Sequence, residues 1–154
     1  MMVSTRGRYA LRAVIDLAEY SADGSYVPLA DIARRQGLSE KYLESIAAAL
    51  SKAGVVVGVR GKGGGYRLAG DPSQCRVLDV LRATEGLLAP VACLACEVNT
   101  CERAKDCPTL PVWEGLGNVV DTYLAGITID TLMREEDEGE APGNCADAGE
   151  DMGA

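Results

Sequence analysis

The sequence predicts a mainly α fold with one small β-hairpin, and three observations support that prediction. Apolar residues recur at three- and four-residue steps through residues 10–50, which is typical of helices with one buried face. A valine-rich run, a glycine-rich turn and a short second run at residues 55–68 indicate a hairpin. A further helical stripe occupies residues 113–127. The 154 residues allow one compact core and a smaller appended element.

The first helix is expected between residues 4 and 21. Ser4 or Thr5 can cap its amino end, and the turn-forming pair Asp23-Gly24 follows its end near Ser21. Its apolar residues are spaced to form one buried face. They are Ala10, Leu11, Val14, Ile15 and Ala18.

Two shorter helices follow, separated by a glycine. Pro28 suits the first turn of the second helix, Gly37 ends it, and Ser39 can cap a third helix that ends at Gly54. Both have an apolar face, made of Leu29, Ile32 and Ala33 and then of Leu43, Ile46, Ala47 and Leu50. Two helices joined by a short turn form the helix-turn-helix pattern of many DNA-binding proteins.

A basic hairpin after these helices makes the pattern a winged helix-turn-helix. Residues 55–60 form the first strand, residues 61–65 the turn and residues 66–68 the return strand. The small residues of the turn let its backbone approach a DNA groove, and the hairpin's cations can contact phosphates or a narrow minor groove. These residues are Gly61 and Gly63 in the turn, with Arg60, Lys62 and Arg67 as cations. An ordinary solvent-exposed hairpin is the competing interpretation.

The third helix is the candidate recognition helix. Residues near the amino end of such a helix reach base edges. Glu44 is suited to accept a hydrogen bond from a cytosine amino group, whereas Ser39, Lys41 and Tyr42 are suited to hold phosphates. A solvated helix face explains each of these residues equally well when it is taken singly.

The net charge of −8 hides an uneven distribution. Residues 1–70 carry ten Lys or Arg and six Asp or Glu, whereas residues 134–154 carry one and eight. A basic amino-terminal half permits binding to nucleic acid through its local field. The sequence shows neither a signal-peptide apolar region nor a run of about 18 apolar residues, so we expect a cytoplasmic protein with reduced thiols and no membrane partner.

Four cysteines within fifteen residues are the main chemical signal in this chain, which has no histidine. Such a group can hold an iron–sulfur cluster, hold zinc, or form a disulfide switch. The cysteines are Cys93, Cys96, Cys101 and Cys107, with Cys75 and Cys145 outside the group. A thioredoxin-like enzyme needs a βαβ context that is missing here, so we expect no enzyme activity. The segment has no helical or strand period, and its order should depend on what it binds.

A short helix ending near Gly86 precedes the cysteines, and a long helix follows them. Val77, Leu78, Val80 and Leu81 should pack the short helix on the winged domain. The apolar stripe of the long helix comprises Trp113, Leu116, Val120, Tyr123, Leu124 and Ile127. A two-fold dimer through this stripe would bury it and pair two recognition helices on a pseudo-palindromic operator. Packing on its own domain is the alternative.

The predicted organisation has four parts. Residues 1–88 form the winged helix-turn-helix domain, 89–108 the cysteine loop, 109–133 the dimerisation helix region and 134–154 an acidic tail. The tail has almost no large apolar side chains, and we expect it to be disordered.

Several segments resemble one known family. They are Thr5-Arg6-Gly7-Arg8-Tyr9-Ala10, Pro28-Leu29-Ala30-Asp31-Ile32-Ala33, Tyr42-Leu43-Glu44, Val59-Arg60-Gly61-Lys62-Gly63-Gly64-Gly65-Tyr66, the spaced cysteines and Ile127-Thr128-Ile129. Over residues 2 to about 133 the chain resembles the IscR-like iron–sulfur transcription regulators of the Rrf2 family. The resemblance implies a homodimeric regulator whose DNA binding depends on a cluster that senses cluster supply, iron, oxidants or nitric oxide. It also places Glu44 and Ser45 where the family reads bases, and Arg60 where its wing enters the minor groove.

The chain departs from this family at two ligand positions. Leu110 stands where the IscR branch has a histidine ligand, and Arg8 stands where the nitric-oxide-sensing branch has an acidic one. Since a cluster commonly takes four thiolates, the simplest interpretation is that the extra cysteine in the group replaces the missing ligand. A zinc-containing or thiol-switch regulator stays open, as does a module that regulates an enzyme through its dimer surface.

Overall fold

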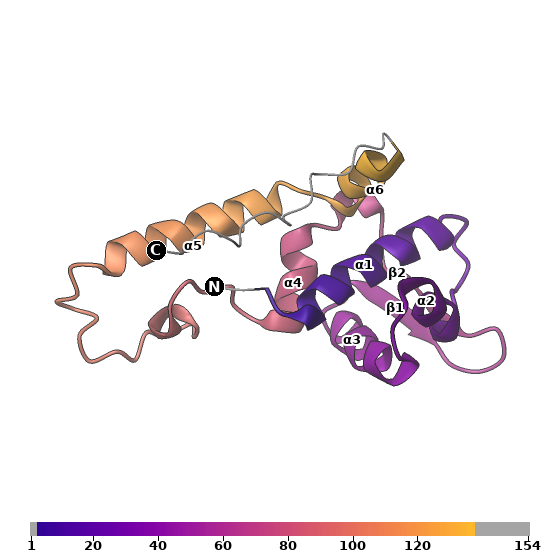
Figure 1. Cartoon of the computed structure of the whole chain (residues 1–154), viewed down its shortest axis with the longest axis horizontal. Coiled ribbons are helices and arrows are strands. Elements are labelled where there is room, and N and C mark those ends of the chain that lie inside the picture. The colour runs from indigo at the N-terminus through magenta and orange to yellow at the C-terminus, as the bar shows by residue number, and fades with distance from the viewer. Residues whose placement is uncertain (1–2, 138–154) are drawn as a thin grey trace, which may run out of the picture.

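The computed structural model describes residues 3–137, with side chains described as far as Arg134. Figure 1 shows a helical body and a long arm, residues 86–126, that leaves the body and returns to it. In chain order the elements are α1 (Thr5–Tyr20), α2 (Leu29–Gln36), α3 (Glu40–Lys52), β1 (Val56–Val59), β2 (Gly65–Leu68), the 3-10 turn η1 (Pro72–Gln74), α4 (Val77–Glu85), the 3-10 turn η2 (Ala92–Leu94), α5 (Leu110–Ala125) and α6 (Ile129–Asp137). The mainly helical fold with a two-stranded antiparallel hairpin confirms the predicted fold class. None of the described helices combines the length and apolarity that crossing a membrane requires.

Helix α1 is the central packing element of the body. Ser4 caps it by accepting a hydrogen bond from the Gly7 amide, and the helix ends at Ser21, as the sequence predicted. Of its predicted apolar stripe, Ala10, Val14 and Ala18 are buried, whereas Leu11 and Ile15 are partly buried against the core. Helices α2, α3, α4 and α6 and strand β2 all contact α1. The orientation of each of these elements therefore depends on α1.

A buried carboxylate joins α1 to α2. Asp16 is 2% exposed and accepts hydrogen bonds from Arg35 Nε at 2.9 Å and from Gln36 Nε2 at 3.0 Å. The Arg35 guanidinium also lies 3.8 Å from the centre of the Tyr20 ring. Because a buried charge is costly unless it is paired and hydrogen-bonded, this arrangement holds the two helices in one relative position.

The turn between α2 and α3 and the hairpin follow the predicted local chemistry. Gly37 ends α2 in the left-handed region with φ of 64°, and the Ser39 hydroxyl accepts from the Tyr42 amide to start α3. The strands pair from Val56 opposite Leu68 to Val59 opposite Gly65, so the first strand is shorter than predicted and the second begins one residue earlier. A Cβ on Gly65 would lie 2.3 Å from the Val27 carbonyl oxygen, so glycine allows this close backbone approach.

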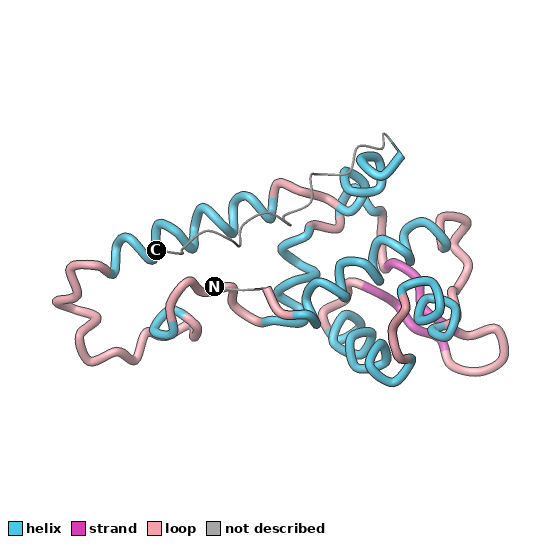
Figure 2. The backbone as a smooth tube through the Cα atoms, viewed as in Figure 1, coloured by secondary structure: helices cyan, strands magenta, loops and turns pink. Residues whose placement is uncertain are grey.

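The long arm returns to the body at a two-bond clamp. The Val77 amide donates to the Ile127 carbonyl at 3.0 Å, and the Ile129 amide donates to the Cys75 carbonyl at 2.9 Å. Ile129 then enters the core and is completely buried. Figure 2 shows the largely irregular segment between α4 and α5 that makes up the outward half of the arm. Residues 75–77 and 127–129, which are distant in sequence, are thus joined at one point.

The C-terminal region differs from the single long helix predicted over residues 109–133. Helix α5 ends at Ala125, Gly126 follows it, and α6 begins at Ile129 with the Thr128 hydroxyl accepting from the Thr131 amide at 3.3 Å. Ile127 therefore lies between the helices, and its assignment to the apolar stripe of one helix was wrong. The first four residues of the predicted disordered tail, 134–137, are helical in α6. The rest of that tail, including Cys145, lies outside the described residues.

Replacing Ile129 by Ala should destabilise the protein by about 2–5 kcal/mol, because a fully buried isoleucine leaves a cavity in the core. Chemical denaturation followed by circular dichroism measures this free energy of unfolding. Val98→Ala is the matched control, since Val98 is 72% exposed and should change stability by about 0.5 kcal/mol or less. Equal effects of the two substitutions would contradict the anchoring role of Ile129.

Candidate nucleic-acid interface and cysteine loop

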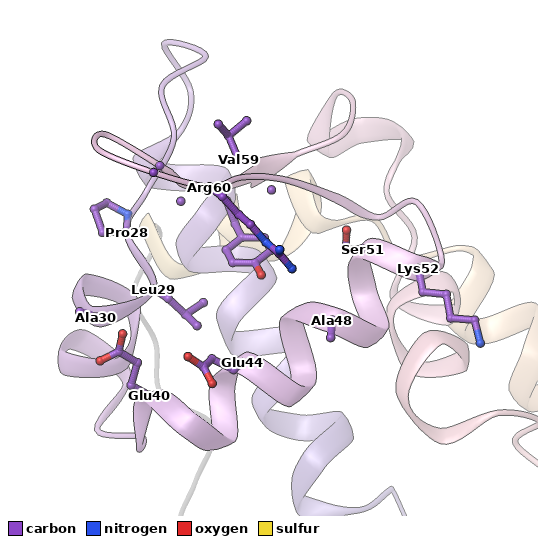
Figure 3. Close-up of a pocket in the computed structure, with 15 residues that line it drawn as sticks. Pro28, Leu29, Ala30, Glu40, Glu44, Ala48, Ser51, Lys52, Val59 and Arg60 are labelled. Atoms are coloured by element: carbon purple, nitrogen blue, oxygen red, sulfur yellow. The ribbon is translucent and has the colours of Figure 1, made fainter.

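Helix α3 and the hairpin enclose a groove of about 740 Å³ together with the amino end of α2. Figure 3 shows it between the wing above and α3 below. Its lining includes Pro28, Leu29, Glu40, Glu44, Ala48, Lys52, Val59, Arg60 and Tyr66. The recognition helix and the wing therefore present one continuous surface.

Two sequence-predicted residues meet in this groove. Figure 3 shows Arg60 extending from the wing into the groove, and Glu44 extending into it from α3. Both residues are exposed. The positive side chain suits a phosphate or a minor groove, whereas the carboxylate suits a base amino group and disfavours phosphate. The groove thus combines a positive side chain on the wing with a carboxylate on α3.

Three other predicted residues, at the start of α3 and within it, also have structural roles. The Ser39 hydroxyl caps the helix, the Tyr42 ring packs edge-on against Tyr9 with centroids 6.1 Å apart, and the Ser45 hydroxyl donates to the Tyr42 carbonyl at 2.8 Å. Lys41 is exposed to solvent. Ser39 and Ser45 remain exposed, so capping and a DNA contact are compatible at these positions.

The turn at the tip of the wing is exposed to solvent, whereas the return strand is at least partly buried. Gly61, Lys62 and Gly63 are exposed, and both glycines have positive φ, at 103° and 77°. Arg67, which the sequence grouped with the DNA-facing cations, instead lies half-buried with its guanidinium 5.2 Å from the Tyr26 ring centre. The wing cations open to solvent are therefore Arg60 and Lys62.

No spacing pattern in the sequence pointed to Arg6, which the structure places beside α3. Its Nη2 donates to the Ser45 carbonyl at 3.0 Å. Arg6 belongs to the opening hexapeptide of the family resemblance, but no spacing rule links α1 to α3. This contact was therefore not predictable from local pattern.

All four clustered cysteines carry free thiols on the segment between α4 and α5. Cys93 and Cys107 are half-buried, and Cys96 and Cys101 are exposed. Among the described side chains, those of residues 3–134, no three cysteines or carboxylates gather in a metal-binding arrangement. The donor chemistry fits an iron–sulfur cluster or zinc, since both accept thiolates. Holding either one requires the loop to close further than it does here.

Hydrogen bonds within the cysteine loop are local. The Ala95 amide donates to the Ala92 carbonyl at 3.1 Å, the Ala104 amide donates to the Cys101 carbonyl at 3.0 Å, and the Cys101 amide donates to the Asn99 side chain at 2.9 Å. Bonds over two or three residues define turns but do not fix distant thiols relative to one another. These bonds therefore leave the four thiols unfixed relative to one another.

The thiols of Cys107, just before α5, and Cys75, just before α4, differ in acidity. The Thr109 hydroxyl lies 3.4 Å from Cys107 Sγ and lowers the pKa of that thiol, helped by nearby backbone amides and Arg103. Burial raises the pKa of Cys75 to about 11, with Asp79 adding to the effect. Between about pH 9 and 11 the unfolded chain releases a proton that folded Cys75 keeps, so stability should fall as pH rises.

Neither of the two positions at which the family has a metal ligand carries a metal-binding side chain in this chain. Leu110 is the first residue of α5, and Arg8 is exposed with its Nη2 donating to the Thr5 hydroxyl at 3.2 Å. A fourth ligand from this chain must come from elsewhere, and the extra cysteine has the right chemistry.

Helix α5 carries an apolar face that its own domain does not bury. Every residue of α5 is at least partly exposed, and Leu116 and Tyr123 of the predicted stripe are 45% and 68% exposed. Val112 and Val119, which the sequence did not assign to the stripe, are 61% and 66% exposed. Arg82 Nη2 donates to Asp121 Oδ2 at 2.7 Å and ties the helix to α4. Helix α5 therefore presents an apolar face to solvent.

Comparisons with known proteins agree with this architecture. The Rrf2 family model, described as an iron-dependent transcriptional regulator, matches residues 3–135. The HTH-type transcriptional regulator IscR of Photobacterium profundum is 39% identical over 143 residues, covering 93% of this chain and 81% of the relative. The solved structure of T. potens IscR is 35% identical with a TM-score of 0.69, covering 93% of this chain and 94% of that one. CymR, described as the global cysteine regulator of B. subtilis, is 32% identical with a TM-score of 0.69, covering 88% and 98%.

In reduced, metal-free protein, iodoacetamide at pH 7 should label Cys107 at least about tenfold faster than Cys75, because the thiolate is the reactive species. Peptide mass spectrometry measures the two rates. Thr109→Val should slow labelling of Cys107 without changing Cys75. Equal labelling rates, or no effect of Thr109→Val, would contradict the assigned cause.

Proposed function

The chain belongs to the Rrf2 family of DNA-binding transcriptional regulators, which are not enzymes, and we propose that it acts as a homodimer whose DNA binding is modulated by an iron–sulfur cluster. The proposed target is a pseudo-palindromic operator, and the proposed location is the cytoplasm, where such a regulator meets DNA. The groove between α3 and the wing carries this proposal, because it presents Glu44 and Arg60 on one surface.

The dimer part of the proposal rests on α5. A solvent-exposed apolar helix face is stabilised when a second copy covers it, and a two-fold arrangement makes the two faces self-complementary. The proposed interface comprises Trp113, Leu116, Val120, Tyr123 and Leu124, with Val112 and Val119 beside them. Leu116, Tyr123, Val112 and Val119 are exposed, whereas Trp113, Val120 and Leu124 are partly buried. The same symmetry would present two recognition helices to two half-sites of an operator.

The sensor part of the proposal rests on four free thiols between α4 and α5. Cys93, Cys96, Cys101 and Cys107 are the proposed ligands. A bound cluster would supply a centre sensitive to iron supply, oxidants or nitric oxide. The role of the protein is to hold four thiolates together, which would order residues 93–107 and link metal binding to the shape of the arm.

A cluster-free thiol switch is the second candidate. Two of the four thiols are exposed, and the sequence separates Cys93 from Cys96 by two residues, a spacing that suits a disulfide. The chain is also similar to Staphylococcus aureus CymR, whose structure is described as an oxidized form, at 28% identity and a TM-score of 0.64. Zinc bound by the same thiolates and an enzyme-regulating interaction module are the remaining alternatives.

Arg60→Ala should weaken DNA binding similarly at all sequences and lower the magnitude of the salt slope by about one, because it removes one phosphate-neutralising cation. Glu44→Ala should reduce discrimination at one base pair by about 1–3 kcal/mol while leaving non-specific affinity equal or higher. Fluorescence anisotropy on a duplex selected from a random pool, measured at several salt concentrations, gives both quantities.

Lys105→Ala is the matched control for these variants, since it removes an exposed cation outside the groove. It should leave the discrimination between sequences unchanged. If both Arg60→Ala and Glu44→Ala bind the selected duplex like the wild type, the groove is not the DNA-reading surface.

Protein purified without oxygen should show broad visible absorption with matching iron and acid-labile sulfide, and Cys93→Ala should weaken or alter that spectrum. Cys75→Ala is the control outside the cluster group and should keep it. A colourless protein that carries zinc or only free thiols would contradict the cluster while leaving the DNA-binding function standing.

A further inference from the structure

The carboxylate of Glu85 reaches from the last residue of α4 to the amino end of α1. Its Oε2 accepts from the Ser4 amide at 3.4 Å, and its Oε1 accepts from the Ser4 hydroxyl. The first turn of α1 contains no acidic residue of its own. Since a helix amino end favours a negative charge, Glu85 supplies from α4 the anion that this turn lacks.

Gly7 is explained by the same carboxylate. It is a buried residue inside α1, where glycine is a poor helix former compared with alanine. A Cβ at this position would lie 2.7 Å from Glu85 Oε1 and 3.1 Å from Glu85 Cδ. The built Cβ would also lie 3.0 Å from Val3 Cγ1, so the absence of a side chain on Gly7 makes room for both Glu85 and Val3.

The same turn of α1 contacts the candidate recognition helix. Arg6, one residue before Gly7, donates from Nη2 to the Ser45 carbonyl of α3 at 3.0 Å. Ser45 follows Glu44, which faces the groove. On the other side, Glu85 is followed by Gly86, where α4 ends and the segment that carries the cysteines begins. A short series of contacts thus connects the start of the cysteine segment to α3.

We infer that Glu85 is a positioning residue that holds the first turn of α1 and, through Arg6, sets the position of α3. A displacement at the start of the cysteine segment would then move the Glu85 carboxylate and alter how α3 is held. The DNA consequence of this inference rests on the proposed function, whereas the mechanical link does not.

Hydrogen exchange tests the mechanical link on the reduced, metal-free full-length protein. Glu85→Gln should speed amide exchange about threefold or more, both in the first turn of α1 and in α3. Glu97→Gln is the matched control, because it removes an exposed carboxylate in the cysteine segment. A change confined to the first turn of α1, or no change, would overturn the inference.

DNA binding gives a second readout. It distinguishes a loss of specificity, which positioning predicts, from the gain in affinity that follows when a negative charge is removed. Removing a negative charge should by itself strengthen binding to DNA. If Glu85 positions α3, Glu85→Gln should instead lower the ratio of specific to non-specific affinity about fivefold. Glu85→Asp, which keeps the charge but shortens the reach, should lower the same ratio. Ratios within twofold of the wild type for both variants would overturn the inference.

Gly7→Ala tests the contact from the opposite side. Alanine inside a helix ordinarily raises the melting temperature. Here it should lower the melting temperature and reproduce the exchange change of Glu85→Gln, because the new methyl group displaces the carboxylate. A stabilised Gly7→Ala protein with unchanged α3 exchange would overturn the inference. If the wild-type protein binds no DNA duplex specifically, the proposed function is contradicted. The hydrogen-exchange comparison then decides the inference by itself.

Discussion

Two backbone hydrogen bonds, from Val77 to Ile127 and from Ile129 to Cys75, fix where the arm rejoins the body. They bring residues 75–77, which lead into α4, and residues 127–129, which follow α5, to one point on the DNA-binding body, and Ile129 secures that point by filling the core. Beyond the clamp, the Arg82–Asp121 ion pair holds α5 beside α4. The cysteine loop is consequently tied to the body at its base and free to respond to chemistry along its length.

Helix α1 connects the parts of the body that recognition requires. Near its carboxyl end, Asp16 binds Arg35 and fixes α2, while its amino end receives Glu85 from α4 and offers Arg6 to α3. Buried or half-buried charged contacts have defined geometries, because losing a partner leaves a charge without compensation. The recognition helix is thus oriented by polar contacts as well as by apolar packing.

The cysteine loop shows that donor chemistry and donor geometry are separate properties. Four thiols stand close in sequence, and the hydrogen bonds within the loop span only a few residues. A metal or cluster that gathers these thiolates would order the segment as it binds, so binding energy and folding energy become coupled. The same flexibility suits a disulfide, because two thiols must approach closely to be joined.

The sequence by itself determined the elements whose signals are local. Apolar spacing, the caps Ser4 and Ser39 and the glycines of the wing specify their helices and hairpin because each depends on residues a few positions apart. The grouped cysteines and the groove-facing Glu44 were recognisable for the same reason. Tertiary structure alone decided the burial of Ile129 and the approach of Glu85 to Gly7. These features depend on contacts between residues far apart in the chain, which leave no periodic trace in the sequence.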